Sequence, residues 1–141
     1  MIIHLNTPKD NEIVNRMRSH GCQVICMYGY DCWTDVIDII ATSRFVISES
    51  LHGLIIAEAY SVPNVWVEFV QHFDQWSFKY QDYFESIDKY GMESIKLYEN
   101  YSWESITDSV ENWQRGNIDC SKMLKSFPLN IDRKWKVRGN E

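Results

Sequence analysis

The chain has 141 residues, of which 45% are hydrophobic and 24% are charged, a balance that fits one compact domain and argues against intrinsic disorder. The formal net charge of -6 argues against a nucleic-acid-binding protein, which would carry a basic face. Basic residues gather near the end of the sequence, where residues 119–141 hold 6 Lys/Arg against 3 Asp/Glu. We therefore expect a single α/β domain over residues 1–127 and a flexible basic C-terminal tail over residues 128–141. Contact of this tail with anionic lipid or an acidic partner is the alternative.

No segment is expected to cross a bilayer, because the longest apolar stretch is interrupted by Glu58, Pro63, Asn64 and Glu68. The four cysteines form no C-x-x-C pair, and the sequence has no zinc-ligand pattern, so we predict no metal. Free thiols fit a reducing cytoplasm, so we expect a cytoplasmic protein. A position peripheral to the inner face of the cell membrane is the alternative.

Short β-rich runs alternate with helical stretches in chain order. The pattern predicts strands at residues 2–5, 23–28, 44–48, 65–69 and 95–98. It predicts helices at residues 8–19, 31–42, 51–60, part of 75–87, 103–113 and near 119–127, with Gly21 and Gly116 ending the first and the fifth. Short connections between such elements are typical of parallel βαβ units. The expected fold is therefore α/β, a Rossmann-like three-layer sandwich with a mostly parallel sheet of four or five strands.

The most informative segment lies between the third strand and its helix and reads Ser48-Glu49-Ser50-Leu51-His52-Gly53. Ligands of open α/β sheets bind beyond the carboxyl ends of the strands, and a helix N-terminus favours phosphate. Ser48 and Ser50 offer hydroxyl donors, Gly53 permits close backbone approach, and His52 can donate to an anion or transfer a proton. The alternative is structural, with a serine as helix N-cap and His52 as a hydrogen-bonded histidine.

Three consecutive stretches of this sequence resemble the polysaccharide pyruvyl transferases. The signature-like segment, residues 48–69, reads SESLHGLIIAEAYSVPNVWVEF. It is followed by residues 78–87, FKYQDYFESI, and preceded by a helix-plus-strand stretch, residues 33–48, WTDVIDIIATSRFVIS. The resemblance covers about residues 30–90, and more loosely the whole chain.

This resemblance implies a GT-B-like architecture of two Rossmann-type halves, of which the chain corresponds to the C-terminal, donor-side half. It implies transfer of pyruvyl from phosphoenolpyruvate to a hydroxyl pair of a sugar or glycan acceptor in exopolysaccharide or other cell-surface polysaccharide biosynthesis. Phosphoenolpyruvate is then a co-substrate, and no cofactor is expected. The acceptor is expected from the other half, supplied by an N-terminal-half partner, with a homo-oligomer as the alternative. The chain alone is expected to bind donor weakly and to turn over poorly.

The resemblance places Leu51 and His52 at the donor site. Some members of the family carry an Arg where this chain has Ser50, so Arg44 or Lys79 is the candidate for the missing positive charge. His52 is the candidate for proton transfer, while Ser48, Ser50 and Gly53 would hold phosphate. The alternative for Lys79 is a solvated lysine whose stem covers Tyr80 or Tyr83.

Three further residues have simpler interpretations. Glu49 is expected to be exposed on the loop. Glu58 lies six positions beyond His52 on a different helix face, so it is expected to be a buried partner for a cation or backbone group. Trp66 is expected in the core, with sugar stacking by Trp66, Trp76 and Tyr83 as the alternative.

Two other functions remain open from the sequence. One is the half of a GT-B glycosyltransferase that uses a nucleotide-sugar donor, with its diphosphate held at the same helix N-terminus. The other is a non-catalytic fragment or interaction domain that self-associates through an exposed apolar face.

Overall fold

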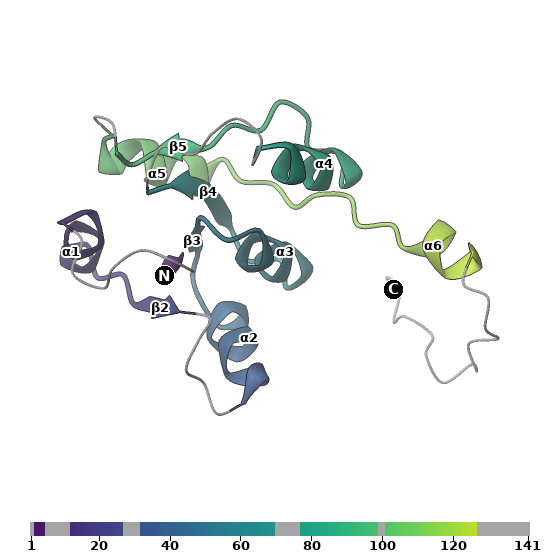
Figure 1. Cartoon of the computed structure of the whole chain (residues 1–141), viewed down its shortest axis with the longest axis horizontal. Coiled ribbons are helices and arrows are strands. Elements are labelled where there is room, and N and C mark those ends of the chain that lie inside the picture. The colour runs from purple at the N-terminus through teal and green to yellow at the C-terminus, as the bar shows by residue number, and fades with distance from the viewer. Residues whose placement is uncertain (1, 5–11, 27–31, 70–76, 99–100, 127–141) are drawn as a thin grey trace.

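The computed structural model describes residues 2–4, 12–26, 32–69, 77–98 and 101–126 (Figure 1). The strands are β1 (Ile2–His4), β2 (Val24–Cys26), β3 (Val46–Ser48), β4 (Asn64–Glu68) and β5 (Ile95–Lys96). The helices are α1 (Glu12–Ser19), α2 (Trp33–Ala41), α3 (Leu51–Ala59), α4 (Phe78–Ser86), α5 (Trp103–Glu111) and α6 (Ser121–Ser126). The expected alternation of strands and helices is confirmed, and the α/β class with it.

The strands pair in the order β2-β1-β3-β4-β5, and each pair is parallel. The register sets Ser48 beside Trp66 and Val67 beside Ile95. From β1 the chain builds first toward β2 and then returns to add β3 on the other side. The order of the strands therefore reverses between β1 and β3, which makes the carboxyl ends of these two strands the topological switch point of the sheet.

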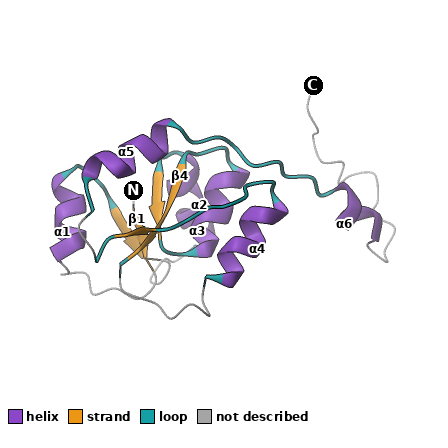
Figure 2. Cartoon of the chain, turned by 90° about the horizontal axis from the view of Figure 1, so that it is seen from above, coloured by secondary structure: helices purple, strands orange, loops and turns teal. Residues whose placement is uncertain are grey.

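Helices cover both faces of the sheet, as Figures 1 and 2 show. On one face, α1 and α5 bury a cluster that includes Met17, Ile47, Val67 and Ile106. On the other face, α2 and α3 pack on β2 and β3, and α3 and α4 enclose a ring-rich cluster of Leu54, Trp66, Tyr80, Phe84 and Ile87. Side chains of β3 and β4 alternate between these clusters, because successive strand residues point to opposite faces.

The helix boundaries follow local signals in most places. Gly21 has φ +78, the left-handed conformation that glycine adopts just beyond a helix end. Ser102 caps α5, with its hydroxyl oxygen accepting from the backbone N–H of Ser105 at 3.1 Å. The prediction for Gly116 is wrong, because α5 ends at Glu111 with Asn112 as its C-cap. Gly116 instead lies buried against Ile87, whose side chain leaves no room for a Cβ atom at this position.

The last described helix, α6, lies apart from the body of the molecule at the end of an extended segment (Figure 2). Residues 128–141, predicted to form a flexible tail, lie outside the described residues. Within the described ranges, none of the helices has the length and apolar character needed to cross a membrane.

Candidate functional site

The turn between β3 and α3 lies at the carboxyl edge of the sheet, beside the switch point. Ser48 ends β3 and is fully buried, and Leu51 begins α3 two residues after Glu49. The structure therefore confirms a strand, a tight polar turn and a helix start at this place. Open α/β sheets bind their ligands in this position.

Ser48 holds the turn together. Its hydroxyl donates to the backbone oxygen of Ser50 at 2.9 Å and accepts from the backbone N–H of Ser50 at 3.0 Å. Both bonds are buried and close within three residues, a local hydroxyl-to-backbone pattern that favours turns over regular structure. Ser48 thus acts on the shape of the turn, rather than through a hydroxyl open to a ligand.

Ser50 is the N-cap residue of α3, but its side chain makes no capping bond. It is 3% exposed, and its Oγ atom has no hydrogen-bond partner among the described residues. Buried hydroxyls are normally bonded, and an unpartnered one costs about 1–3 kcal/mol. The first turn of α3 therefore combines a positive helix end with a hydroxyl that has no acceptor in the described part of the chain.

The next three residues differ in exposure. His52 is exposed in the first turn of α3, whereas Gly53 is buried. Leu51 is half-buried and packs against the ring-rich cluster. An imidazole placed here can meet an anion or a reacting group from solvent, so the structure leaves His52 available for the role that the sequence suggests.

Glu49 is half-buried and bonded, so the expectation that it is exposed is wrong. Its carboxylate accepts from the backbone N–H of Phe69 at 2.9 Å, directly after β4. Its backbone oxygen accepts from the Tyr80 hydroxyl at 2.5 Å. Burial, with Glu49 and then Glu68 nearby, raises the pKa of Tyr80 to about 12. Tyr80 therefore stays protonated and can donate this bond at neutral pH.

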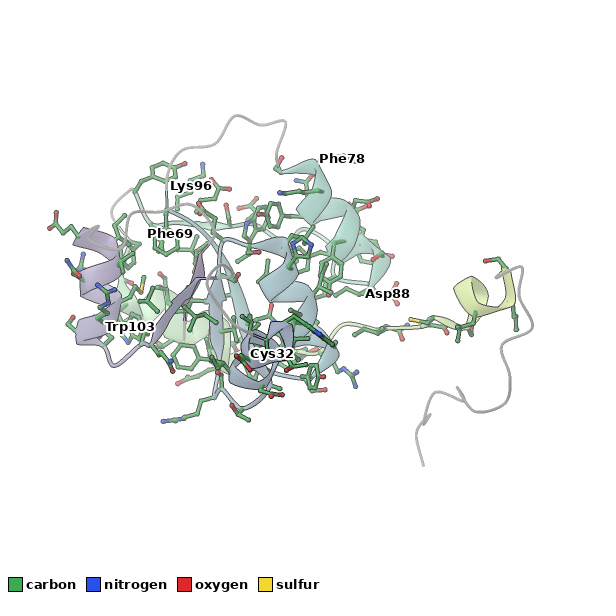
Figure 3. All side chains as sticks on the ribbon, turned by 60° about the horizontal axis from the view of Figure 1, so that its bottom comes forward. Cys32, Phe69, Phe78, Asp88, Lys96 and Trp103 are labelled. Carbon is green, nitrogen blue, oxygen red and sulfur yellow. The ribbon has the colours of Figure 1, made fainter. Side chains whose placement is uncertain are left out.

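Lys79 lies on the first turn of α4 at the same edge of the sheet. It is exposed, and its ammonium lies over the Tyr80 ring, 5.1 Å from the centroid. This arrangement fits the alternative for Lys79, in which its side chain lies over Tyr80. It also keeps the charge beside Tyr80, whose hydroxyl bonds to the turn. Figure 3 shows Phe78 at this end of α4 and Asp88 at the other.

Arg44 lies elsewhere. It precedes β3, whose first residue Val46 donates its N–H to the backbone oxygen of Pro63 at the amino end of the strand. The β3–α3 turn follows the opposite end of that strand. The structure therefore brings Lys79, but not Arg44, toward the turn.

Glu58 has the structural role expected for it. It is fully buried and accepts from Asn64 Nδ2 at 3.2 Å, from Trp113 Nε1 at 3.1 Å and from the Gly116 N–H at 3.0 Å. It also forms an ion pair with Lys89. These bonds fasten the segment after α5 to α3, and they leave Glu58 no part in the turn.

The sequence did not indicate the contacts of Tyr80 and Glu49. The one signal in the sequence was that Tyr80 lies within the family-like segment at residues 78–87, but no role was assigned to Tyr80 there. Trp66 is buried, as expected, with its ring stacked on Tyr80. Trp76, considered for sugar stacking, lies outside the described residues.

The arrangement suits an oxyanion ligand better than a metal. Helix-end N–H groups, a buried hydroxyl, an exposed imidazole and a nearby ammonium are all donors or cations. In the described ranges, no cluster of three or more His, Cys, Asp or Glu side chains is placed to hold a metal ion. Comparison with known proteins found no matching family model, no matching curated protein and no matching solved structure.

Proposed function

We propose that the protein is the donor-side half of a pyruvyl-transferase-like enzyme with a GT-B-like arrangement. In this proposal the β3–α3 turn binds phosphoenolpyruvate. The observation that carries it is the first turn of α3, where the buried Ser50 hydroxyl has no partner among the described residues and His52 is exposed. The location beside the switch point of a parallel sheet supports it further.

The reaction requires an acid for the donor and a base for the acceptor. A proton adds to the methylene carbon of phosphoenolpyruvate, and a sugar hydroxyl attacks the adjacent carbon and loses its proton. The bond from that carbon to the phosphate oxygen then breaks and inorganic phosphate leaves. A second sugar hydroxyl bonds to the same carbon and gives its proton to the departing phosphate, which completes the ketal. In this proposal His52 transfers a proton or donates to the phosphate, and the α3 N-terminus stabilises the charge of the phosphate.

Lys79 supplies the positive charge in this proposal. Its ammonium lies over Tyr80, whose hydroxyl contacts the turn through Glu49. In this proposal the exposed Lys79 side chain turns toward the donor and meets its carboxylate or phosphate as a point charge. Arg44 is not part of the proposed site, because it precedes the other end of β3.

Donor binding is the appropriate test, because the acceptor is expected to be held by the other half of such an enzyme. Isothermal titration with phosphoenolpyruvate, inorganic phosphate and uridine diphosphate compares the candidate ligands directly. We expect phosphoenolpyruvate to bind most tightly, and His52→Ala and Lys79→Met each to weaken it by about tenfold. Lys125→Met on α6 is the matched control and should change nothing. Tighter binding of uridine diphosphate would favour the nucleotide-sugar alternative instead.

A further inference from the structure

A pocket of about 380 Å³ lies near the amino ends of β4 and β5, whereas the β3–α3 turn follows the carboxyl end of β3. The loop before β5 and the last turn of α5 complete its wall. Its volume is within the range of small-molecule sites. It is lined by Asn64, Val65, Trp66, Lys89, Met92, Glu93, Ile95, Ser109, Asn112, Trp113 and Gln114.

The lining is mostly apolar, with two indole rings among the contributing side chains. Trp66 is 5% exposed, and its indole N–H has no acceptor within the described part of the chain. Met92 packs against the same cluster as Trp66, and Ile95 adds branched apolar surface from the cluster on the opposite face of the sheet. Such walls favour a ring that can pack against them.

The cation in the wall, Lys89, is already paired. The Lys89 ammonium is paired with the buried Glu58 and lies over the Trp113 ring, 4.8 Å from its centroid. The Trp113 indole N–H also donates to Glu58. An anionic ligand would therefore meet a cation that is already neutralised, with the exposed carboxylate of Glu93 opposing it.

The remaining polar groups of the wall are uncharged. Asn112 and Gln114 contribute exposed amides, of which the Asn112 Nδ2 group already donates to the backbone oxygen of Asp108 at 2.8 Å. The Ser109 hydroxyl donates to the backbone oxygen of Ser105 at 2.8 Å, so it offers a ligand its acceptor side. Amide rims around an apolar wall recognise neutral hydrogen-bonding groups by position rather than by charge.

We propose that this pocket is a second ligand site, which binds a small, uncharged, planar ring compound carrying an amide or similar hydrogen-bonding group. The ring packs against the apolar wall, and its polar substituent bonds to the amide rim. This site is separate from the proposed donor site and does not depend on it.

Benzamide is the probe, followed through the indole N–H resonances of Trp66 and Trp113 in ¹H–¹⁵N spectra. We expect saturable shifts of both resonances, with benzoate, the anion of the same shape, binding about tenfold more weakly. Ser109→Phe fills the pocket and should weaken benzamide binding by at least about tenfold. Ser86→Phe is the matched control, since Ser86 is an exposed helical serine outside the lining, and it should leave the affinity unchanged.

Absence of a saturable shift, benzoate binding as tight as benzamide, or unchanged affinity in a folded Ser109→Phe variant would each overturn the proposal. If Ser109→Phe fails to fold, Gln114→Trp closes the exposed rim instead, and the same loss of affinity is expected. Unchanged affinity in that variant would overturn the proposal equally.

Discussion

Tyr80 stacks on Trp66 with ring centroids 4.5 Å apart and planes 12° apart, and it donates its hydroxyl to the backbone oxygen of Glu49. One rigid side chain of α4 therefore contacts both the middle of β4 and the turn after β3. The stacking adds to the area that the rings bury, and the hydrogen bond fixes the direction of the turn. The shape of the proposed donor site thus depends on a residue that need not touch the donor.

Tyr80→Phe keeps the ring and removes the hydroxyl. We expect the free energy of unfolding in urea to fall by about 1 kcal/mol, the usual net value of one hydrogen bond. Tyr90→Phe is the control, because Tyr90 is 71% exposed, and it should change stability by less than about 0.5 kcal/mol. Equal effects of the two variants would show that the bond to Glu49 contributes nothing.

The raised pKa of Tyr80 predicts alkaline unfolding. Its pKa rises from 10.0 to about 12 on folding, so only the unfolded chain loses this proton between those values. Below about pH 10 the ionisation of Tyr80 does not affect the free energy of unfolding. Above that pH the free energy of unfolding falls, and by about pH 12 this group has lowered it by about 2–3 kcal/mol. Tyr83, whose pKa burial also raises to about 12, adds a smaller loss because it is half-exposed. Urea unfolding at several pH values should show a shallower decline for Tyr80→Phe; an unchanged slope would contradict this assignment.

Glu58→Gln tests the buried carboxylate. The variant removes the counter-charge of Lys89 and turns an amide NH₂ toward groups that are themselves donors. Breaking a buried ion pair on one side costs about 3–5 kcal/mol, and we expect a loss of this order in urea unfolding. Glu85→Gln is the control, since Glu85 is exposed on α4.

A double-mutant cycle separates the ion pair from the other bonds to Glu58. Lys89→Met should cost less in the Glu58→Gln background than in the native chain, because the charge it removes is already unpaired there. Additive losses would mean that the ion pair itself contributes nothing to the large effect.

The elements were predictable from the sequence because their signals are local. Strand and helix periodicity placed β3, α3 and β4, and a carboxylate in an apolar helix indicated that Glu58 needs a partner. The identity of the partners was not predictable. Glu58 meets Trp113 and Gly116 across 55 and 58 residues, and Glu49 meets Phe69 across 20, so these contacts depend on how the helices pack. The same long-range packing decided the role of Gly116, which local rules assign to a helix end.

Gly116→Ala introduces a close contact. An added Cβ would lie 2.6 Å from Cδ1 and 2.8 Å from Cγ1 of Ile87, so the variant overpacks this junction. We expect a loss of about 1–3 kcal/mol in the free energy of unfolding. Ile87→Ala removes both of those atoms, so the same glycine substitution should cost much less in that background. An equal cost in both backgrounds would show that another contact is responsible.

Ser48→Ala and Ser50→Ala separate the structure of the turn from its proposed function. Loss of the Ser48 hydroxyl leaves the Ser50 N–H without its acceptor, so we expect urea unfolding to show a loss of about 1–3 kcal/mol. Ser50→Ala removes a buried hydroxyl that has no partner among the described residues, so the unliganded protein should be as stable as the native chain or more stable. If the hydroxyl binds the donor, the same variant should weaken phosphoenolpyruvate binding in a titration. A Ser50→Ala protein that loses stability like Ser48→Ala and binds phosphoenolpyruvate as well as the native chain would show that Ser50 is only a structural residue of the turn.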